Sequence, residues 1–338
     1  FAKITEGSGL ILGEDLNIIV SECTIQNYVV TNVKQIAEEK VNSLFDHVDL
    51  TTGTAYISSA RHLENLDQFI SGINVQPSVD IKNAVIMNDI LWKQELNGND
   101  AGEEGFVEKI KTTTIEPAYK DTATVRCWNQ APSCEKDACY VPITNDNLQV
   151  LNGQYEDNVH KLINFDMYWN NVDRRHCGLF RTVNQKLTIE NLKLRHVQSE
   201  SASEAFTGAL VGNVANQAAT VNVYNVHVEG KCVINGGTAA AGGLIGHTNG
   251  AVSVMQSDIA NAIVTSTGNS GGLIGETGDG VTNIKEVSCD GEMSVEGKNA
   301  SGGIIGQTNQ AKVTVDTAKF LSKLEVTSDN THAGGVIG

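Results

Sequence analysis

Gly-Gly-Leu-Ile-Gly at residues 242–246 is the stretch that decides the fold, because the chain returns to it at nearly regular intervals. Full or near copies lie at 271–275, 302–306 and 334–338, and looser copies at 208–212 and 177–181. These six segments end at residues 181, 212, 246, 275, 306 and 338, which gives spacings of 31, 34, 29, 31 and 32. A near-constant period is typical of repeat proteins, in which each unit is stabilised by its neighbours.

Between the copies, apolar residues alternate with polar ones. Val221, Val223, Val226 and Val228 show the pattern, and the later intervals repeat it. Period-two alternation with β-branched residues predicts strands. We therefore expect an all-β fold, a right-handed parallel β-helix (solenoid) with about 31 residues per three-strand coil. One coil alone cannot bury its apolar side, whereas stacked coils can.

The glycines of the copies are expected to form the corners of the coils. Glycine allows a positive φ at a tight corner, and its missing side chain lets neighbouring coils stack closely. The corner glycines predicted in this way are Gly212, Gly242, Gly243, Gly246, Gly271, Gly272, Gly275, Gly302, Gly303, Gly306, Gly334 and Gly335.

Composition excludes several other classes of protein. Glycine accounts for 33 of 338 residues and proline for only 4, and collagen needs far more of both. Lys plus Arg number 24 against 40 Asp plus Glu, so the net charge of −16 argues against a nucleic-acid binder. No run of 18 or more apolar residues occurs, so the sequence predicts no membrane span.

The five best copies resemble GLUG repeats, the Gly-Gly-Leu-hydrophobic-Gly coils of large secreted and cell-surface, adhesin-like proteins. Residues 57–66, 87–92, 140–143 and 151–155 resemble the segments that usually precede such repeats. The likeness covers about residues 54–92 and 140–338. It implies a solenoid in an extracellular or cell-surface protein and says almost nothing about chemistry.

We expect five parts in the chain. Residues 1–34, with Gly9-Leu10-Ile11-Leu12-Gly13, form the last coil of a preceding array, and residues 35–53 form a short helical cap or linker. Residues 54–92 are the opening coils of a second array, and residues 93–139 are a cysteine-containing insert. Residues 140–338 are the GLUG-like solenoid, which we expect to continue beyond 338. The 338 residues would then belong to a much longer chain or to one protomer of a filament.

The cysteines predict an oxidising environment. A disulfide is expected among Cys127, Cys134 and Cys139, and the third of these could pair with a distant cysteine such as Cys177. Their spacings of six and four residues do not fit the usual zinc motifs. Cys232 and Cys289 are expected to be buried thiols. Asn299-Ala300-Ser301 is an N-glycosylation sequon, so Asn299 is a candidate for glycosylation.

No segment predicts catalysis. Gly268 to Gly272 resemble the nucleophile loop of trypsin-like proteases, but the sequence contains no matching His segment. His176 precedes Cys177, and adjacent residues of a strand face opposite sides, which argues against a Cys–His dyad. We expect no catalytic, cofactor-binding or metal-binding residue.

The function expected from these features is that of a non-catalytic structural and adhesive module, a stiff stalk with interaction loops in a long extracellular surface protein or filament. Its partners would be further coils of the same chain or identical subunits stacked end to end, and a surface or host glycan or protein would be its ligand. The alternative is an accessory β-helix of a secreted hydrolase, such as an immunoglobulin A protease-like or glycan-degrading enzyme. A third interpretation, a glycan-binding or glycan-cleaving β-helix, would need an exposed groove with aromatic and carboxylate groups.

Overall fold

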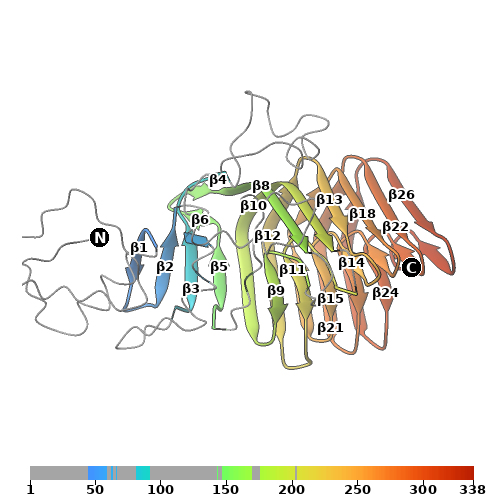
Figure 1. Cartoon of the computed structure of the whole chain (residues 1–338), viewed down its shortest axis with the longest axis horizontal. Helices are drawn as coiled ribbons and strands as arrows, with labels where there is room; N and C mark the ends of the chain where they lie inside the picture. Colours follow the sequence, from blue (N-terminus) through green and yellow to red (C-terminus); the bar gives the residue numbers. More distant parts are fainter. Residues whose placement is uncertain are drawn as a thin grey trace, which may run out of the picture.

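The chain forms a β-solenoid whose coils are stacked along its long axis, from β1 to β26 (Figure 1). The structure, a computed structural model, describes residues 45–58, 62–63, 66, 81–91, 143, 147–169, 176–201 and 204–338. Within this part, only His62, Leu63 and Leu66 are helical. The expected disulfide-containing insert at 93–139 and the expected coil at 1–34 lie outside the described residues.

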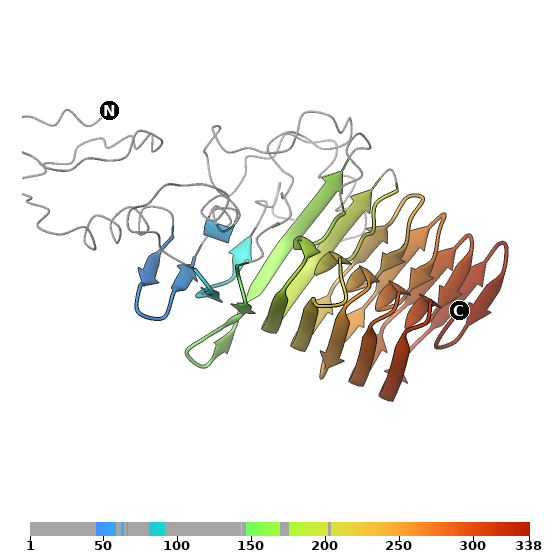
Figure 2. The same ribbon diagram turned by 90° about the horizontal axis from the view of Figure 1, so that it is seen from below.

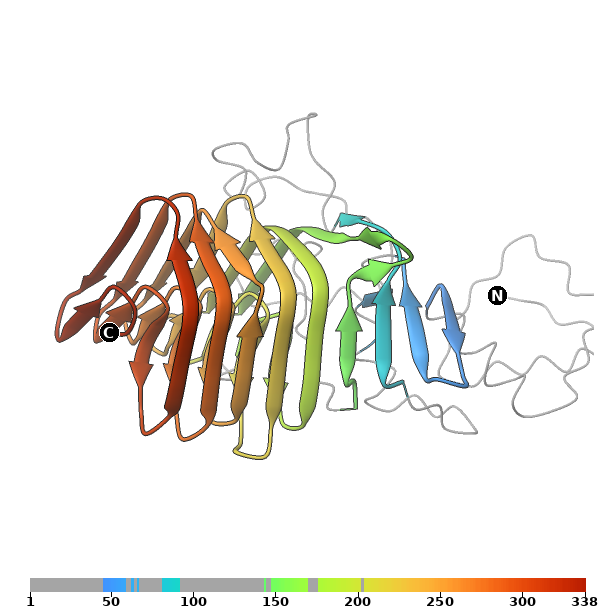
Figure 3. The same cartoon turned by 180° about the vertical axis from the view of Figure 1, so that it is seen from behind.

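Most strands belong to one 16-stranded sheet. Its members are β1 (His47–Asp49), β2 (Thr54–Ile57), β3 (Asn83–Ile86), β4 (Ile90–Leu91), β5 (Val150–Asn152), β8 (Lys161–Trp169), β10 (Lys186–Ser201), β12 (Thr220–Glu229), β13 (Cys232–Asn235), β16 (Ala251–Met255), β17 (Asp258–Ala260), β18 (Ala262–Ser266), β21 (Val281–Asp290), β22 (Met293–Gly297), β25 (Lys312–Phe320) and β26 (Leu324–Ser328). From β2 to β25, its neighbouring strands are parallel and come from successive coils. Figure 3 shows its long strands side by side.

Three smaller sheets complete the described structure. The five-stranded sheet contains β9 (Phe180–Val183), β11 (Val211–Val214), β15 (Ile245–Thr248), β20 (Ile274–Thr277) and β24 (Ile305–Thr308). The four-stranded sheet contains β14 (Ala241–Gly242), β19 (Ser270–Gly271), β23 (Ala300–Gly302) and β27 (His332–Gly334). β6 (Gln154–Tyr155) and β7 (Asn158–Val159) form a short antiparallel hairpin.

The described residues from β5 onward form six coils, which begin at β5, β10, β12, β16, β21 and β25. The predicted fold class and period are therefore confirmed. Coil 220–248 contains four strands, β12 to β15, because the Gly-Gly bend divides its last side into the short strands β14 and β15. Corresponding strands of successive coils lie side by side (Figure 2).

The core is a set of straight rows of apolar side chains that run from coil to coil. One such row is Ile189, Val223, Val254 and Ile284, which pair in register and are buried. Burying an aliphatic side chain of this size contributes about 1.5–3 kcal/mol. Since every interior coil supplies each row with one residue, the apolar free energy is spread along the whole axis.

The two ends of the described array differ. At the beginning, β1 pairs with β2 in antiparallel orientation, with Val48 opposite Ala55, so the edge of β2 is covered. Of the helical cap or linker expected at 35–53, residues 47–49 are β1 and residues 50–53 are a turn, whereas residues 35–44 lie outside the described residues. At the other end, β25, β26 and β27 each pair with a preceding coil only, within the part of the chain that the structure describes.

Candidate functional site

The glycines of the repeated segment permit close contact between the backbones of neighbouring coils. A Cβ atom added to Gly243 would overlap the carbonyl oxygen of Gly272, and one added to Gly272 would overlap that of Gly303. A Cβ on Gly242 would overlap the carbonyl oxygen of Ile245 across the bend. Close stacking is therefore the physical role of these residues.

The positive φ expected at these glycines is not found. Among the described glycines, those with positive φ are Gly53, Gly230, Gly237 and Gly291, none of which belongs to a copy of the repeated segment. The bend after Gly242 is made with ordinary φ values, and it places Leu244 and Ile245 inside the core with no exposed surface. The copies do mark corners, but the left-handed conformation occurs elsewhere in the coil.

Non-glycine residues supply most of the left-handed corners. Asn191, Asn225, Gln256, Glu286 and Thr317 occupy the same place in five successive coils, with φ between 48° and 60°. The Asn225 amide donates to Asn191 Oδ1 at 2.8 Å, and Asn191 lies 3.4 Å from Asn152 Oδ1. Asn tolerates this conformation better than most residues. Period-two alternation does not predict this row, although the asparagines at 191 and 225 are a usable signal.

A row of stacked rings crosses three coils beside the Gly-Gly bends. The ring of Phe206 lies between His176 and His247, with centroid separations of 5.0 and 4.2 Å. The backbone N–H of Phe206 donates to His176 Nδ1 at 3.0 Å, and His247 Nδ1 donates to Asn213 Oδ1 at 2.9 Å. His176 therefore accepts a hydrogen bond that its protonated form could not accept.

Burial, like the hydrogen bond accepted by His176, favours the neutral form of the two imidazoles. Desolvation lowers the pKa of His176 to about 4, with smaller contributions from the charges of His247 and Arg181. Desolvation also lowers the pKa of His247, against the opposing charge of Glu276. Both imidazoles are therefore neutral at pH 7, and the stack is a structural element at that pH.

The same row continues into the next coils as hydrogen-bonded amides and one carboxylate. The Asn269 amide donates to Glu276 Oε2 at 3.0 Å and also to Gln307 Oε1. The Asn309 amide donates to Glu276 Oε1 at 2.6 Å. These hydrogen bonds join neighbouring coils and engage both oxygens of Glu276, while Asn269 Oδ1 is buried without a hydrogen-bond partner.

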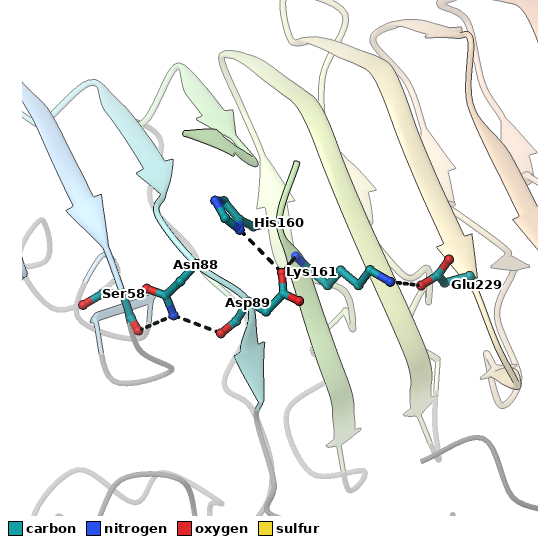
Figure 4. Close-up of polar contacts among 6 residues, drawn as sticks. All are labelled: Ser58, Asn88, Asp89, His160, Lys161 and Glu229. Carbon is teal, nitrogen blue, oxygen red and sulfur yellow. Dashed lines mark hydrogen bonds and ion pairs between the residues drawn. The ribbon is translucent and has the colours of Figure 1, made fainter. Parts of the chain in front are cut away.

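A second polar network joins the opening coils to the array (Figure 4). The Asn88 amide donates to the Ser58 carbonyl at 3.1 Å, while Asp89 Oδ1 accepts from the Lys161 backbone at 2.9 Å. The Lys161 ammonium then reaches over to Glu229 Oε1 at 2.9 Å. Partial burial works to raise the pKa of Glu229, but Lys161 holds that pKa below its usual value. The network locks the coil 81–91 to the coils that follow the 93–139 segment.

The described cysteines are free thiols. Cys177, Cys232 and Cys289 are all buried, as expected for the last two. Cys177 does not form the disulfide considered for it; its Sγ donates to the Glu200 carbonyl at 3.5 Å. Desolvation raises the pKa of each of the three thiols to about 12. None of them is a nucleophile at neutral pH, and Cys127, Cys134 and Cys139 lie outside the described residues.

The two segments that resemble protease motifs are structural. Ser270 is fully buried, and its hydroxyl donates to the Glu296 carbonyl at 2.7 Å and contacts Ser266 Oγ at 3.0 Å. The ring of His176 stacks on Phe206, whereas Cys177 is buried and its Sγ donates to the Glu200 carbonyl, so the two side chains do not form a dyad. Among the described residues, no three His, Cys, Asp or Glu side chains come together in a way that could hold a metal ion. Nor does this part contain a helix long and apolar enough to cross a membrane.

Asn299 is exposed on the bend between β22 and β23. Its backbone carbonyl accepts hydrogen bonds from the hydroxyls of Ser328 and Thr331. The sequon residue Ser301 is fully buried. Glycosylation of Asn299 remains a prediction.

The last coil, 312–338, presents core residues to solvent. Val336 and Ile337 are 43% and 37% exposed, whereas Leu273 and Ile274, at the same place in an interior coil, are 0% exposed. Val313, Val315, Phe320, Leu324 and Val326 are also only partly buried. We call this surface the end face; it combines apolar side chains with unpaired strand edges.

No family model and no curated protein matches this sequence. A solved structure that is similar in fold is the crystal structure, at 1.30 Å resolution, of a candidate immunoglobulin A1 protease from Bacteroides ovatus. The TM-score is 0.53, the sequence identity is 15%, and the match covers 87% of this chain and 74% of that one. At this identity the likeness concerns the fold alone, and the resemblance to GLUG repeats stays a prediction.

Proposed function

We propose that this chain is a non-catalytic structural and adhesive module, a stiff stalk within a long extracellular surface protein or filament. The observation that carries the proposal is the unbroken parallel register from β2 to β25, with a continuous apolar core beneath it. Each coil is joined to the next by backbone hydrogen bonds on several sides, so the array has no hinge between coils. Its net charge of −16 limits side-to-side association between copies.

The end face supports a partner made of further β-coils. Folded proteins cover such edges, because unpaired strands and apolar side chains promote association. Further coils of the same chain, or identical subunits stacked end to end, would cover the end face.

The proposal is tested on the native protein at its natural length. We expect antibodies against the 140–338 region to label intact cells and rotary-shadowed molecules to be rods. Labelling only after cell lysis, or a native particle of 36.1 kDa with no further coils, would contradict the proposal.

A second candidate function is an accessory region of a secreted hydrolase. What favours it is the fold shared with the candidate immunoglobulin A1 protease. In this case, the buried Ser270 and Cys177 would take no part in hydrolysis, and a separate domain would carry the reaction. The native full-length protein would cleave immunoglobulin A1, and deletion of 140–338 would reduce cleavage. Intact heavy chain after prolonged incubation with the full-length protein would exclude this candidate.

A further inference from the structure

The outer surface of the large sheet contains an uncharged area in the middle of the array. We define the neutral patch as six outward-facing residues on β12, β16 and β21: Asn222, Tyr224, Ser253, Met255, Val281 and Asn283. Residues two apart on a strand face the same side, and the register places Asn222, Ser253 and Asn283 in one line across the strands. The three strands lie next to one another in Figure 3.

Charge lies beside the central line of this patch and not within it. The line of Asn222, Ser253 and Asn283 continues into Thr188 on β10 and Thr314 on β25, which are also uncharged. The flanking lines carry the charges, Lys186 and Lys312 on one side and Glu190, Lys285 and Asp316 on the other. The central line is therefore uncharged across five coils, in a chain with 64 charged residues, 24 basic and 40 acidic.

The polar groups of the patch are not used within the described part of the chain. The side chains of Asn222, Ser253 and Asn283 make no hydrogen bond there, and the same holds for the Tyr224 hydroxyl. In the five-stranded sheet, by contrast, His247 is hydrogen-bonded to Asn213 and Glu276 to Asn309, each across to a neighbouring coil. One polar row thus stabilises the fold, and the other offers its donors and acceptors outward.

Two apolar groups accompany these free polar ones. Tyr224 is 39% exposed and Val281 is 42% exposed, which is unusual beside a core in which interior residues are close to 0%. A tyrosine ring offers an apolar face and a polar tip, a combination found at binding surfaces. The scarcity of aromatic residues after 201 made such a platform unexpected from composition.

We propose that the neutral patch binds an extended, uncharged polysaccharide that lies along the solenoid axis. Successive strands are about 4.8 Å apart, close to the length of one sugar residue in an extended glycan chain. Asn222, Ser253 and Asn283 would each meet the hydroxyl groups of one sugar, and Tyr224 would stack on a ring. The absence of charge on the patch and the net charge of −16 both disfavour an acidic polysaccharide.

The proposal does not depend on the stalk role, since it places ligand binding on the flat sheet face and not in loops or at the tip. Failure of glycan binding would leave the stalk role standing. A protein ligand would need no line of sugar-spaced hydrogen-bonding groups, and binding only to protein would count against the proposal.

Affinity electrophoresis of the full chain tests it with four soluble polysaccharides: galactomannan, xyloglucan, mixed-linkage β-glucan and polygalacturonate. We expect at least one neutral glycan to retard the protein and polygalacturonate to leave its mobility unchanged. Tyr224→Ala and the double variant Asn222→Ala/Asn283→Ala should each weaken retardation at least tenfold, and Tyr224→Phe should retain most of it.

Thr265→Ala is the matched control, because Thr265 is an outward-facing polar residue on a different side of the coil. It should bind like the unchanged protein, and equal unfolding midpoints would show that all variants fold. The proposal is overturned if no neutral glycan binds, if polygalacturonate binds as well as the neutral glycans, or if the patch variants bind as tightly as the Thr265→Ala control.

Discussion

Coil 251–277 and coil 312–338 follow the same sequence pattern, yet they differ in burial. In the first, Leu273 and Ile274 are completely buried between two neighbours. In the second, Val336 and Ile337 hold the same positions and are about two-fifths exposed, because a neighbour is described on one side only. The difference teaches that a coil owes its core to stacking, not to its own sequence.

The largest expected difference between the two coils is in the stability lost when the isoleucine at the same position of each coil, Ile274 or Ile337, is replaced by alanine. Ile274→Ala should lower the free energy of unfolding by about 3–4 kcal/mol, since it removes buried atoms and leaves a cavity. Ile337→Ala should cost less than about 1 kcal/mol, because its side chain is already partly in water. Urea unfolding of both variants measures the two losses in unfolding free energy. Equal losses would show that the end face is covered in solution.

Glycine replacement sharpens the same comparison without removing any atoms. Gly272→Ala would force a Cβ into the Gly303 carbonyl and should cost about 2–3 kcal/mol. Gly335 holds the same place in coil 312–338, where a Cβ would meet nothing within 4 Å. Gly335→Ala should therefore be neutral or slightly stabilising. A large cost at Gly335 would contradict the assignment of close stacking as the role of these glycines.

Acid should weaken the interior ring stack. His176 has a pKa of about 4 in the folded chain, below the ordinary 6.5, so the unfolded chain binds the proton first. Stability should fall as the pH drops from 6.5 towards 4, by ~2–3 kcal/mol from this residue. His176→Gln should reduce that loss between pH 8 and pH 5. An unchanged pH profile for His176→Gln would refute the assignment.

The left-handed corner gives the smallest expected effect, with opposite signs in coil 312–338 and in the interior coil 220–248. Thr317 has a φ of 60°, which is strained for a β-branched residue, and Asn225 has a φ of 52° at the same corner of an interior coil. Thr317→Asn should stabilise by about 1 kcal/mol, and Asn225→Thr should destabilise by about 1–2 kcal/mol. Thermal unfolding checks both, and a loss of stability in Thr317→Asn would show that the corner is not strained.

The period, the strands and the apolar rows could be predicted, because each depends on local alternation and on a repeated segment. The role of the glycines was predicted only in part: Gly243 and Gly272 serve close stacking, but the positive φ lies at residues such as Asn225. Nothing in period-two alternation marks the residue at which a strand bends into the left-handed region.

The candidate surfaces were harder to predict than the fold. Asn222, Ser253 and Asn283 form a line only once the cross-coil register is known, and coil lengths that vary from 29 to 34 residues hide it. Whether a polar row is satisfied internally depends on side-chain geometry across coils. His247 reaches Asn213, whereas the Ser253 side chain makes no hydrogen bond to its neighbours in the row.

Addition of one coil to the end face tests the central claim most directly. A copy of residues 307–338 fused after Gly338 should stack on β25, β26 and β27 and bury Val336 and Ile337. In the extended protein, the cost of Gly335→Ala in urea unfolding should rise from near zero to that of Gly272→Ala, about 2–3 kcal/mol. A cost of Gly335→Ala that stays near zero in the extended protein would contradict the claim that stacking of successive coils creates the core.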